Sequence, residues 1–191
     1  MKLQQLKFKL KLHPHPVKSE PAQAGLTKAA VLIPIIENKD EKLEIWLTQR
    51  PTHLKHHPGQ ISFPGGKLET QDSSLWHCAI RETEEEIGID ATSWRSLSTL
   101  SNLNTLTGFQ IFPFIAVNQV QSEQVNIQLN QNEVDCLIKL PLNFLLYQSK
   151  IQTIHLHRHN NQHEVYGFYY QDKFIWGATA AILRELKSRL L

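Results

Sequence analysis

The sequence of 191 residues is poor in cysteine and has no long apolar run. Its two cysteines, Cys78 and Cys136, are too few for a disulfide framework, so we expect two unpaired thiols in a reducing compartment. No apolar run approaches the roughly 18 residues that cross a bilayer, and residues 1–16 lack the continuous apolar core of a secretory signal. These absences predict a soluble, cytoplasmic protein.

The chain also lacks a strong excess of charge of either sign. Lys and Arg number 20 against 18 Asp and Glu, which gives a net charge of +2 at pH 7 with neutral histidines. A dedicated nucleic-acid binder is expected to be far more basic. The hydrophobic share of 41% and the charged share of 20% are ordinary for globular proteins. We therefore expect one globular domain that partners neither nucleic acid nor membrane.

The N-terminal 24 residues differ in composition from the remainder. They are rich in lysine, contain Pro14, Pro16 and Pro21, and precede the first clear strand pattern. We interpret residues 1–24 as an extension laid on the domain with its lysines in solvent. Residues 25–191 are then the single domain.

Apolar patterning within residues 25–191 predicts strands flanked by helices. The aliphatic runs 29–36 and 43–48 predict neighbouring strands near the centre of a sheet. A strand at 109–117 follows, and a hairpin over 151–170 is expected to continue the sheet late in the chain. The spacing of apolar residues in 178–191 predicts a terminal helix. The fold class is therefore α/β in the broad sense (α+β), a sandwich with a mixed β-sheet between helices.

A further helix is bounded clearly by its end residues. Ser73 or Ser74 is suited to the N-cap, and the helix is expected to run to Ile87. Gly88 follows at the position where a left-handed residue commonly ends a helix.

Three glutamates cluster along one edge of this predicted helix. Glu82 and Glu86 are four residues apart and stack about 6 Å along the axis, with Glu85 beside them. Carboxylates converging in this way suit oxygen-seeking cations such as Mg²⁺ or Mn²⁺. Arg81 lies four residues before Glu85 and can pair with it. An acidic edge taken alone is also typical of a merely solvated face.

The acidic helix belongs to a longer pattern that resembles the Nudix box. The matching residues are Gly66, Asp72, Arg81, Glu82, Glu85, Glu86, Gly88 and Ile89. Three features depart from that pattern. Asp72 replaces the first glutamate of the box, and eight residues rather than seven separate it from Arg81. Thr83 also replaces an aliphatic residue.

These departures resemble the coenzyme A pyrophosphatase branch of the Nudix family. That branch has the extra residue, uses Asp at this position, and has an upstream segment to which residues 46–66 (WLTQRPTHLKHHPGQISFPGG) are similar. The similarity is nearly continuous from Leu47 to Ile89.

The resemblance implies a reaction and roles for individual residues. Nudix hydrolases split a diphosphate linked to another group, using divalent metal and a water nucleophile. Carried over by position, Glu82 and Glu86 are the chief metal ligands, with Glu85 as a further ligand and the carbonyl of Gly66 completing the shell. Arg81 joins these three glutamates in the catalytic set.

The branch implies coenzyme A, and its thioesters as well, as the small-molecule partner. Hydrolysis would yield 4′-phosphopantetheine, free or acylated, and adenosine 3′,5′-bisphosphate. Cationic contacts to the phosphates are expected from Arg50, Lys55, His57 and Lys67. A homodimer is left open.

Two other functions fit parts of the pattern. The box specifies diphosphate chemistry and not the attached group, so ADP-ribose, NADH or a nucleoside triphosphate are alternative substrates. A ligand-binding module that has lost turnover is a second alternative. Such modules usually lose glutamates of the box, whereas this chain retains all three.

Overall fold

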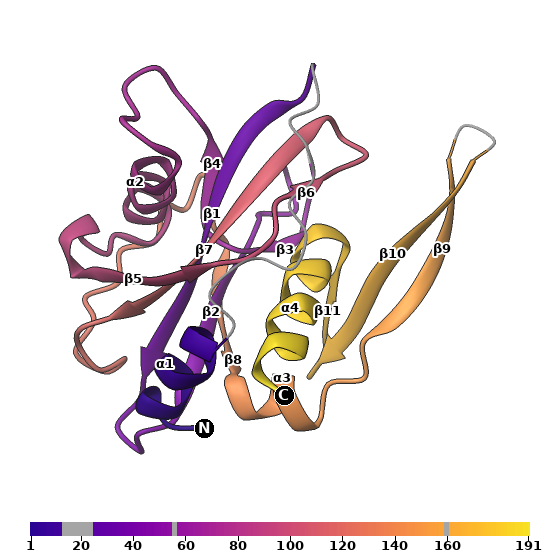
Figure 1. Cartoon of the computed structure of the whole chain (residues 1–191). Helices are drawn as coiled ribbons and strands as arrows, with labels where there is room; N and C mark the ends of the chain where they lie inside the picture. The colour runs from indigo at the N-terminus through magenta and orange to yellow at the C-terminus, as the bar shows by residue number, and fades with distance from the viewer. Residues whose placement is uncertain (13–24, 55–56, 159–160) are drawn as a thin grey trace.

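The computed structural model describes residues 1–12, 25–54, 57–158 and 161–191. A mixed sheet of eight strands is built around β1 (Thr27–Glu37), which runs through its centre (Figure 1). β1 pairs in parallel with β7 (Phe109–Asn118) and antiparallel with β2 (Leu43–Gln49) and β4 (Gly65–Lys67). The prediction of two neighbouring central strands is confirmed.

Four short strands extend the central sheet from β2 and β7. β3 (Ile61–Ser62) and β8 (Cys136–Pro141) pair with β2. β5 (Trp94–Thr99), which follows a 3-10 turn at Ala91–Ser93, and β6 (Leu103–Asn104) pair with β7. β1 and β2 are therefore covered on both edges, which suits their nearly continuous apolar sequences.

Alternate residues of β1 feed two apolar cores, one on each face of the sheet. Leu32 and Ile36 pack with residues of α2 (Leu75–Ile87). Ile33 and Ile35 belong to the core that includes residues of α4 (Gly177–Leu190). The period of two along a strand directs these side chains to opposite faces. Helices on both sides of a mixed sheet confirm the predicted α+β fold class.

The C-terminal hairpin forms a separate sheet instead of extending the central one. β9 (Gln152–Arg158), β10 (Asn161–Tyr170) and β11 (Lys173–Trp176) make an antiparallel sheet of three strands. The hairpin prediction is confirmed, but the expectation that it continues the central sheet is wrong. In Figure 1, α4 lies between β10 and the central strands.

The N-terminal segment lies on the domain as a helix, α1 (Leu3–Leu12). Leu6 and Leu10 are buried in the same core as α4, so the segment packs on the domain through these leucines, while Lys2 and Lys11 are exposed. Their four-residue spacing gives α1 an apolar stripe that can pack on the domain. The boundary at residue 25 stays a prediction.

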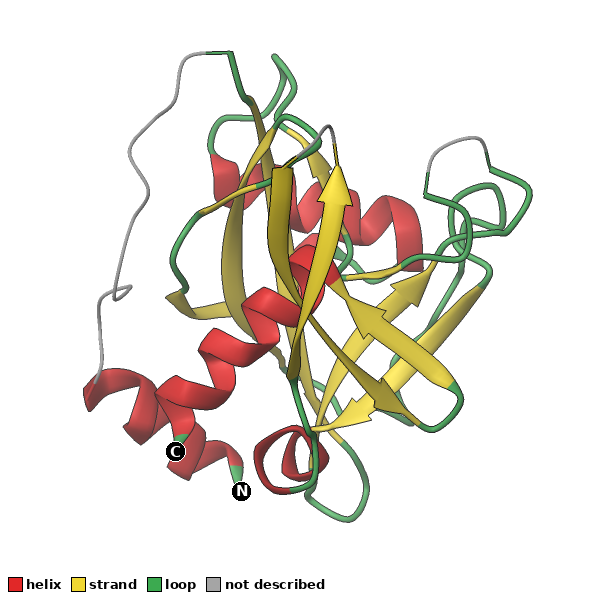
Figure 2. Ribbon diagram, turned by 90° about the vertical axis from the view of Figure 1, so that its right-hand side faces the viewer, coloured by secondary structure: helices red, strands yellow, loops and turns green. Residues whose placement is uncertain are grey.

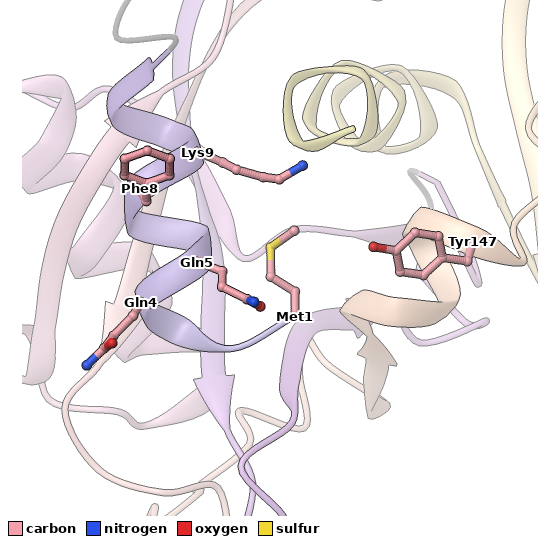
Figure 3. A pocket seen from close by; sticks show the side chains of 6 residues that line it. All are labelled: Met1, Gln4, Gln5, Phe8, Lys9 and Tyr147. Carbon is pink, nitrogen blue, oxygen red and sulfur yellow. The ribbon is translucent and has the colours of Figure 1, made fainter.

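A pocket of about 480 Å³ opens where α1 meets the short helix α3 (Leu142–Tyr147) (Figure 3). It is lined by Met1, Gln4, Gln5, Phe8, Lys9 and Tyr147. Two of its charged groups have hydrogen-bond partners within the chain. The amino group of Met1 donates to Asn143 Oδ1 at 2.7 Å, and Lys9 Nζ donates to the carbonyl of Leu190. None of the helices that the described residues form has the length and apolar character of a bilayer span.

Candidate active site

Helix α2 begins and ends as its flanking residues predict. Ser74 is the N-cap, and its Oγ accepts a hydrogen bond from the backbone N–H of His77 at 3.1 Å. Gly88 ends the helix with φ of 71°, and its N–H donates to the carbonyl of Glu84 at 2.8 Å. A side chain at Gly88 would also collide with the backbone of Gln128, so both conformation and space favour glycine here.

Glu86 is a buried carboxylate, with 6% of the residue exposed. Its Oε2 accepts from Thr48 Oγ1 at 3.2 Å, and its Oε1 accepts from the N–H of Gly65 at 3.4 Å. Burial outweighs these two hydrogen bonds and raises the pKa of Glu86 to about 8. The carboxyl therefore favours a proton or a cation at neutral pH.

The carboxylate of Glu82 lies against the backbone of Gly66, a residue that has no side chain. A Cβ atom added at Gly66 would sit 2.3 Å from Cδ of Glu82 and 2.4 Å from its Oε1. Any side chain at position 66 must displace this carboxylate. Burial is the main cause that raises the pKa of Glu82 above its ordinary value. Glycine thus allows the β4 backbone and a partly desolvated acid to meet.

Arg81 connects three carboxylates. Its Nε and Nη2 donate to the two oxygens of Asp72 at 2.9 and 3.0 Å. Nη2 also lies 3.0 Å from Glu82 Oε1, and Nη1 donates to Glu85 Oε2 at 3.0 Å. The predicted pairing of Arg81 with Glu85 is confirmed.

Asp72 is the buried anchor of this group, and no part of its side chain is exposed. The hydrogen bonds from Arg81 are the largest cause that holds the pKa of Asp72 well below its usual range. The N–H of Glu69 at 2.9 Å and Nδ1 of His77 at 3.1 Å add to the set. Asp72 therefore occupies the position where the Nudix pattern has glutamate, and it acts there as the partner of Arg81. The contact with His77 was not foreseen from sequence.

The carboxylates differ in how well they could hold a cation. Glu85 lies at the rim, with 54% of its side chain exposed and Arg81 attached to it. Glu82 and Glu86 are the buried pair, and repulsion between them adds to the raised pKa of Glu86. Across the part of the chain that is described, no three His, Cys, Asp or Glu side chains are already grouped as metal ligands. Two desolvated carboxylates without full charge compensation still fit a hard divalent cation.

A loop far along the sequence brings a further acidic group to the site. The N–H of Gln128 donates to the carbonyl of Ile87, and that of Asn130 to the carbonyl of Glu86, each at 3.0 Å. The loop thereby follows the end of α2, and the negative charge of Glu133 raises the pKa of both Glu82 and Glu86. Glu133 lies outside the box, so its spacing in the sequence gives no sign of this proximity.

Two of the predicted phosphate-contact residues lie on or next to strands that contact Glu86. Arg50 directly follows β2, which carries Thr48, and Lys67 ends β4, which begins at Gly65. Lys67 is exposed, with Nζ 5.7 Å from the centre of the Phe109 ring. Arg50 therefore lies directly after one of the two strands that contact Glu86, and Lys67 lies at the end of the other.

The loop after Arg50 is closed by hydrogen bonds across its base. The N–H of Arg50 donates to the carbonyl of Gln60 at 2.9 Å, and that of Gln60 to the carbonyl of His57 at 3.2 Å. His57 is exposed and has a left-handed φ of 54°. Lys55 lies outside the described residues. Its role as a phosphate contact stays a prediction, as does that of His57.

Comparison with known proteins agrees with this geometry. Residues 26–143 match the NUDIX domain family, a stretch that contains β1, β2, β4 and the whole of α2. The chain belongs to the Nudix family. This Nudix hydrolase is 40% identical over 162 residues to an uncharacterized Nudix hydrolase NudL from Yersinia enterocolitica, covering 85% of this chain and 80% of the relative. A NudL of Yersinia pestis is 38% identical over 163 residues, covering 85% of this chain and 79% of the relative.

Among solved structures, the Nudix hydrolase is similar to an Ap4A hydrolase from C. elegans. The TM-score is 0.50 at 21% sequence identity, with 60% of this chain and 80% of the other covered. This likeness concerns the fold. Family and relatives together identify a hydrolase that acts on a nucleotide-derived substrate.

Proposed function

We propose that this Nudix hydrolase cleaves the diphosphate of coenzyme A and of its thioesters. The products are 4′-phosphopantetheine, free or acylated, and adenosine 3′,5′-bisphosphate. One observation carries the proposal. The segment similar to the coenzyme A branch, residues 46–66, contributes both hydrogen bonds that orient Glu86, from Thr48 and from Gly65. The segment that resembles the coenzyme A branch is thus hydrogen-bonded directly to the buried acid, Glu86.

Glu82 and Glu86 would hold Mg²⁺ or Mn²⁺, with the Gly66 carbonyl completing the shell. Glu85 at the rim would serve as a further ligand. Such a cation, when bound, neutralises the diphosphate and lowers the pKa of a bound water, so that hydroxide is available at neutral pH.

The other residues of the site position the carboxylates and the substrate. Arg81 fixes Glu82 and Glu85 relative to Asp72, so the acidic edge keeps its shape. A carboxylate of the cluster takes the proton of the attacking water, phosphorus gains the new oxygen, and the bond to the bridging oxygen breaks. Arg50, Lys55, His57 and Lys67 contact the substrate phosphates.

Product analysis by mass spectrometry tests the proposal. The protein is incubated with coenzyme A in the presence of Mg²⁺, of Mn²⁺, or of chelator. We expect metal-dependent release of adenosine 3′,5′-bisphosphate together with 4′-phosphopantetheine. Dephospho-coenzyme A serves as the matched substrate without the 3′-phosphate, and we expect it to react more slowly.

The same assay separates the alternatives. Intact coenzyme A beside cleaved ADP-ribose, NADH or nucleoside triphosphate would retain the diphosphate chemistry and reject the proposed substrate. Binding of a nucleotide without turnover of any of them would identify a ligand-binding module.

A further inference from the structure

The end of β2 carries two adjacent polar residues whose side chains point to opposite faces of the sheet. The hydroxyl of Thr48 donates to Glu86 at 3.2 Å, on the face covered by α2. Successive side chains of a strand alternate, so Gln49 points to the other face. Its strand partners, Ile61 and Cys136, both pack in the core on that side. Thr48 thus orients a carboxylate of the site, while the half-buried amide of Gln49 serves another part of the chain.

The amide nitrogen of Gln49 contacts the loop between β2 and β3. Its Nε2 donates to the carbonyl of Gly59 at 3.2 Å. Gly59 belongs to a turn over residues 57–60, in which the N–H of Gln60 donates to the carbonyl of His57 at 3.2 Å. A carbonyl inside such a turn has no strand partner, and Gln49 supplies the donor that it needs. The side chain of Gln49 therefore connects this turn to the end of β2.

Cys136 determines which end of the amide faces the turn. It lies directly opposite Gln49 in the pairing of β8 with β2, and its Sγ donates to Gln49 Oε1 at 3.4 Å. An amide oxygen can only accept, so the thiol hydrogen directs the oxygen toward β8 and the nitrogen toward Gly59. The reverse orientation would set the amide oxygen against the Gly59 carbonyl, where neither atom can donate.

The backbone beside Gln49 holds two loops. The N–H of Arg50 donates to the carbonyl of Gln60 at 2.9 Å, which closes the loop over residues 50–60. The carbonyl of Gln49 accepts from the N–H of Asp135 at 2.8 Å, at the end of the loop that carries Glu133. In Figure 2 the loops, drawn in green, gather beyond this end of the strands. Both loops therefore leave the sheet next to Gln49.

We propose that Gln49 is a positioning residue, which holds the turn over residues 57–60 where His57 meets a phosphate of coenzyme A. This inference rests on the proposed function, which makes His57 a phosphate contact. His57 is exposed and has a left-handed φ of 54°, a conformation that a residue with a side chain keeps only where its surroundings fix it. Gly59 lies two residues further on, so its hydrogen bond from Gln49 is one such constraint.

Loss of the contact from Gln49 should affect substrate binding more than the chemical step. Glu86 keeps its hydrogen bonds from Thr48 and Gly65, which do not involve the Gln49 amide. A displaced phosphate contact weakens the binding of substrate and of transition state alike, which raises KM and leaves kcat unchanged. A change in the carboxylates would instead lower kcat. The two kinetic constants therefore separate positioning of the turn from damage to the site.

Steady-state kinetics of the full chain with coenzyme A and Mg²⁺ test this role. Gln49→Met keeps the length of the side chain but has no N–H to donate. We expect KM to rise about 3- to 10-fold, in line with the loss of one neutral hydrogen bond, while kcat stays within about twofold of wild type. Gln4→Met is the matched control, since Gln4 is exposed on α1, outside both loops (Figure 3), and it should have the wild-type KM and kcat.

Two variants of Cys136 test the orientation of the amide. Cys136→Ser keeps a donor to Gln49 Oε1 and should have the wild-type KM. Cys136→Ala has no donor, so the amide can reverse, and we expect KM to rise about two- to threefold. If Gln49→Met does not fold, this pair decides the outcome, and equal KM values for the two variants would then contradict the role of Gln49.

Hydrogen exchange gives a readout that does not depend on turnover. In Gln49→Met the amide of Gln60 should exchange at least about threefold faster than in wild type, while the amides of α2 keep their rates. A wild-type KM in Gln49→Met would overturn the positioning role, and so would a loss confined to kcat. A wild-type protein that leaves coenzyme A intact would overturn the proposed function, and with it the phosphate contact of His57, even where exchange at Gln60 rises.

Discussion

Two buried acids, Asp72 just before helix α2 and Glu86 on it, have opposite electrostatic surroundings. Asp72 receives two hydrogen bonds from Arg81, and its pKa is held well below the usual range. Glu86 receives hydrogen bonds only from uncharged donors, Thr48 and Gly65, and its pKa is raised to about 8. The positive charge of Arg81 compensates the first acid, whereas the described donors to the second carry no charge. The comparison supports our proposal that Glu86 binds a cation, whereas Asp72 already has a cationic partner within the chain.

The largest expected effect comes from removing the charge of Glu86. Glu86→Gln keeps the shape of the side chain but lacks the anionic oxygen that would hold Mg²⁺ or Mn²⁺. We expect metal-dependent hydrolysis to fall at least about 1,000-fold, in line with the several kcal/mol that such a cation supplies. Initial rates with coenzyme A measure this. Glu84→Gln is the control, because Glu84 is an exposed acid on the same helix, and it should retain the wild-type rate.

Removing the charge of Asp72 should act on stability. Asp72→Asn leaves Arg81 without its buried partner, which we expect to lower the free energy of unfolding by about 3 kcal/mol at pH 7. Urea denaturation measures the loss. Asp40→Asn is the control, since Asp40 is exposed and its pair with Lys42 is at the surface, and it should change stability by less than about 0.5 kcal/mol.

The effect of Asp72 should also depend on pH. Its folded pKa lies below the unfolded value of about 3.9, so its contribution is complete above about pH 4 and is lost as pH falls through the folded pKa. The stability difference between wild type and Asp72→Asn should therefore be constant from pH 5 to pH 7 and shrink below about pH 4. An equal difference at pH 7 and pH 2 would contradict the assignment.

Gly66 tests the contact between backbone and carboxylate. Gly66→Ala adds the Cβ that collides with Glu82, so the carboxylate must move while Glu86 keeps its partners. We expect a loss of roughly 100-fold in hydrolysis, as is typical when a reacting group is misplaced by about 1 Å. Raising the Mg²⁺ concentration should recover part of the rate if the displaced group is a metal ligand. A wild-type rate for Gly66→Ala would show that Glu82 is not required at its present position.

The smallest expected effect is a gain of stability from Glu86→Gln in chelator. A raised carboxyl pKa makes the charge costly in the fold, and the cost is absent below about pH 4 and grows as pH rises toward 8. We expect the variant to exceed wild type by about 1 to 2 kcal/mol at pH 7 and to match it near pH 4. Thermal melting at both pH values measures this difference. Saturating Mg²⁺ should remove the gain, because the cation stabilises only the wild-type carboxylate.

Sequence reasoning was most successful where local pattern decides structure. The ends of α2 follow from Ser74 and Gly88, and the pair of Arg81 with Glu85 follows from helical spacing. The strands 29–36 and 43–48 were apparent because their apolar runs are short and bounded by polar residues. Each of these features depends on residues close together in the chain.

The features that sequence did not predict depend on distant contacts. Glu133 reaches the site through a loop that follows α2, and no spacing relates it to the box. α1 becomes part of the core because Leu6 and Leu10 meet α4, almost the full chain length away. The apolar pattern of residues 151–170 predicts a hairpin, but whether the hairpin joins the central sheet or forms its own depends on contacts between elements far apart in the chain.

The parallel pairing of β1 with β7 has a consequence for how the protein folds. Thr27 pairs with Phe109 and Ile35 with Val117, so 82 residues separate the partners throughout this ladder. Such non-local pairing slows folding, because a long loop must close before its contacts form. The loop encloses the whole of α2, whose core also needs Ala116 of β7. During synthesis, the acidic helix therefore emerges well before the strand that completes its packing, and hydrolytic activity should appear only after residue 118 has left the ribosome.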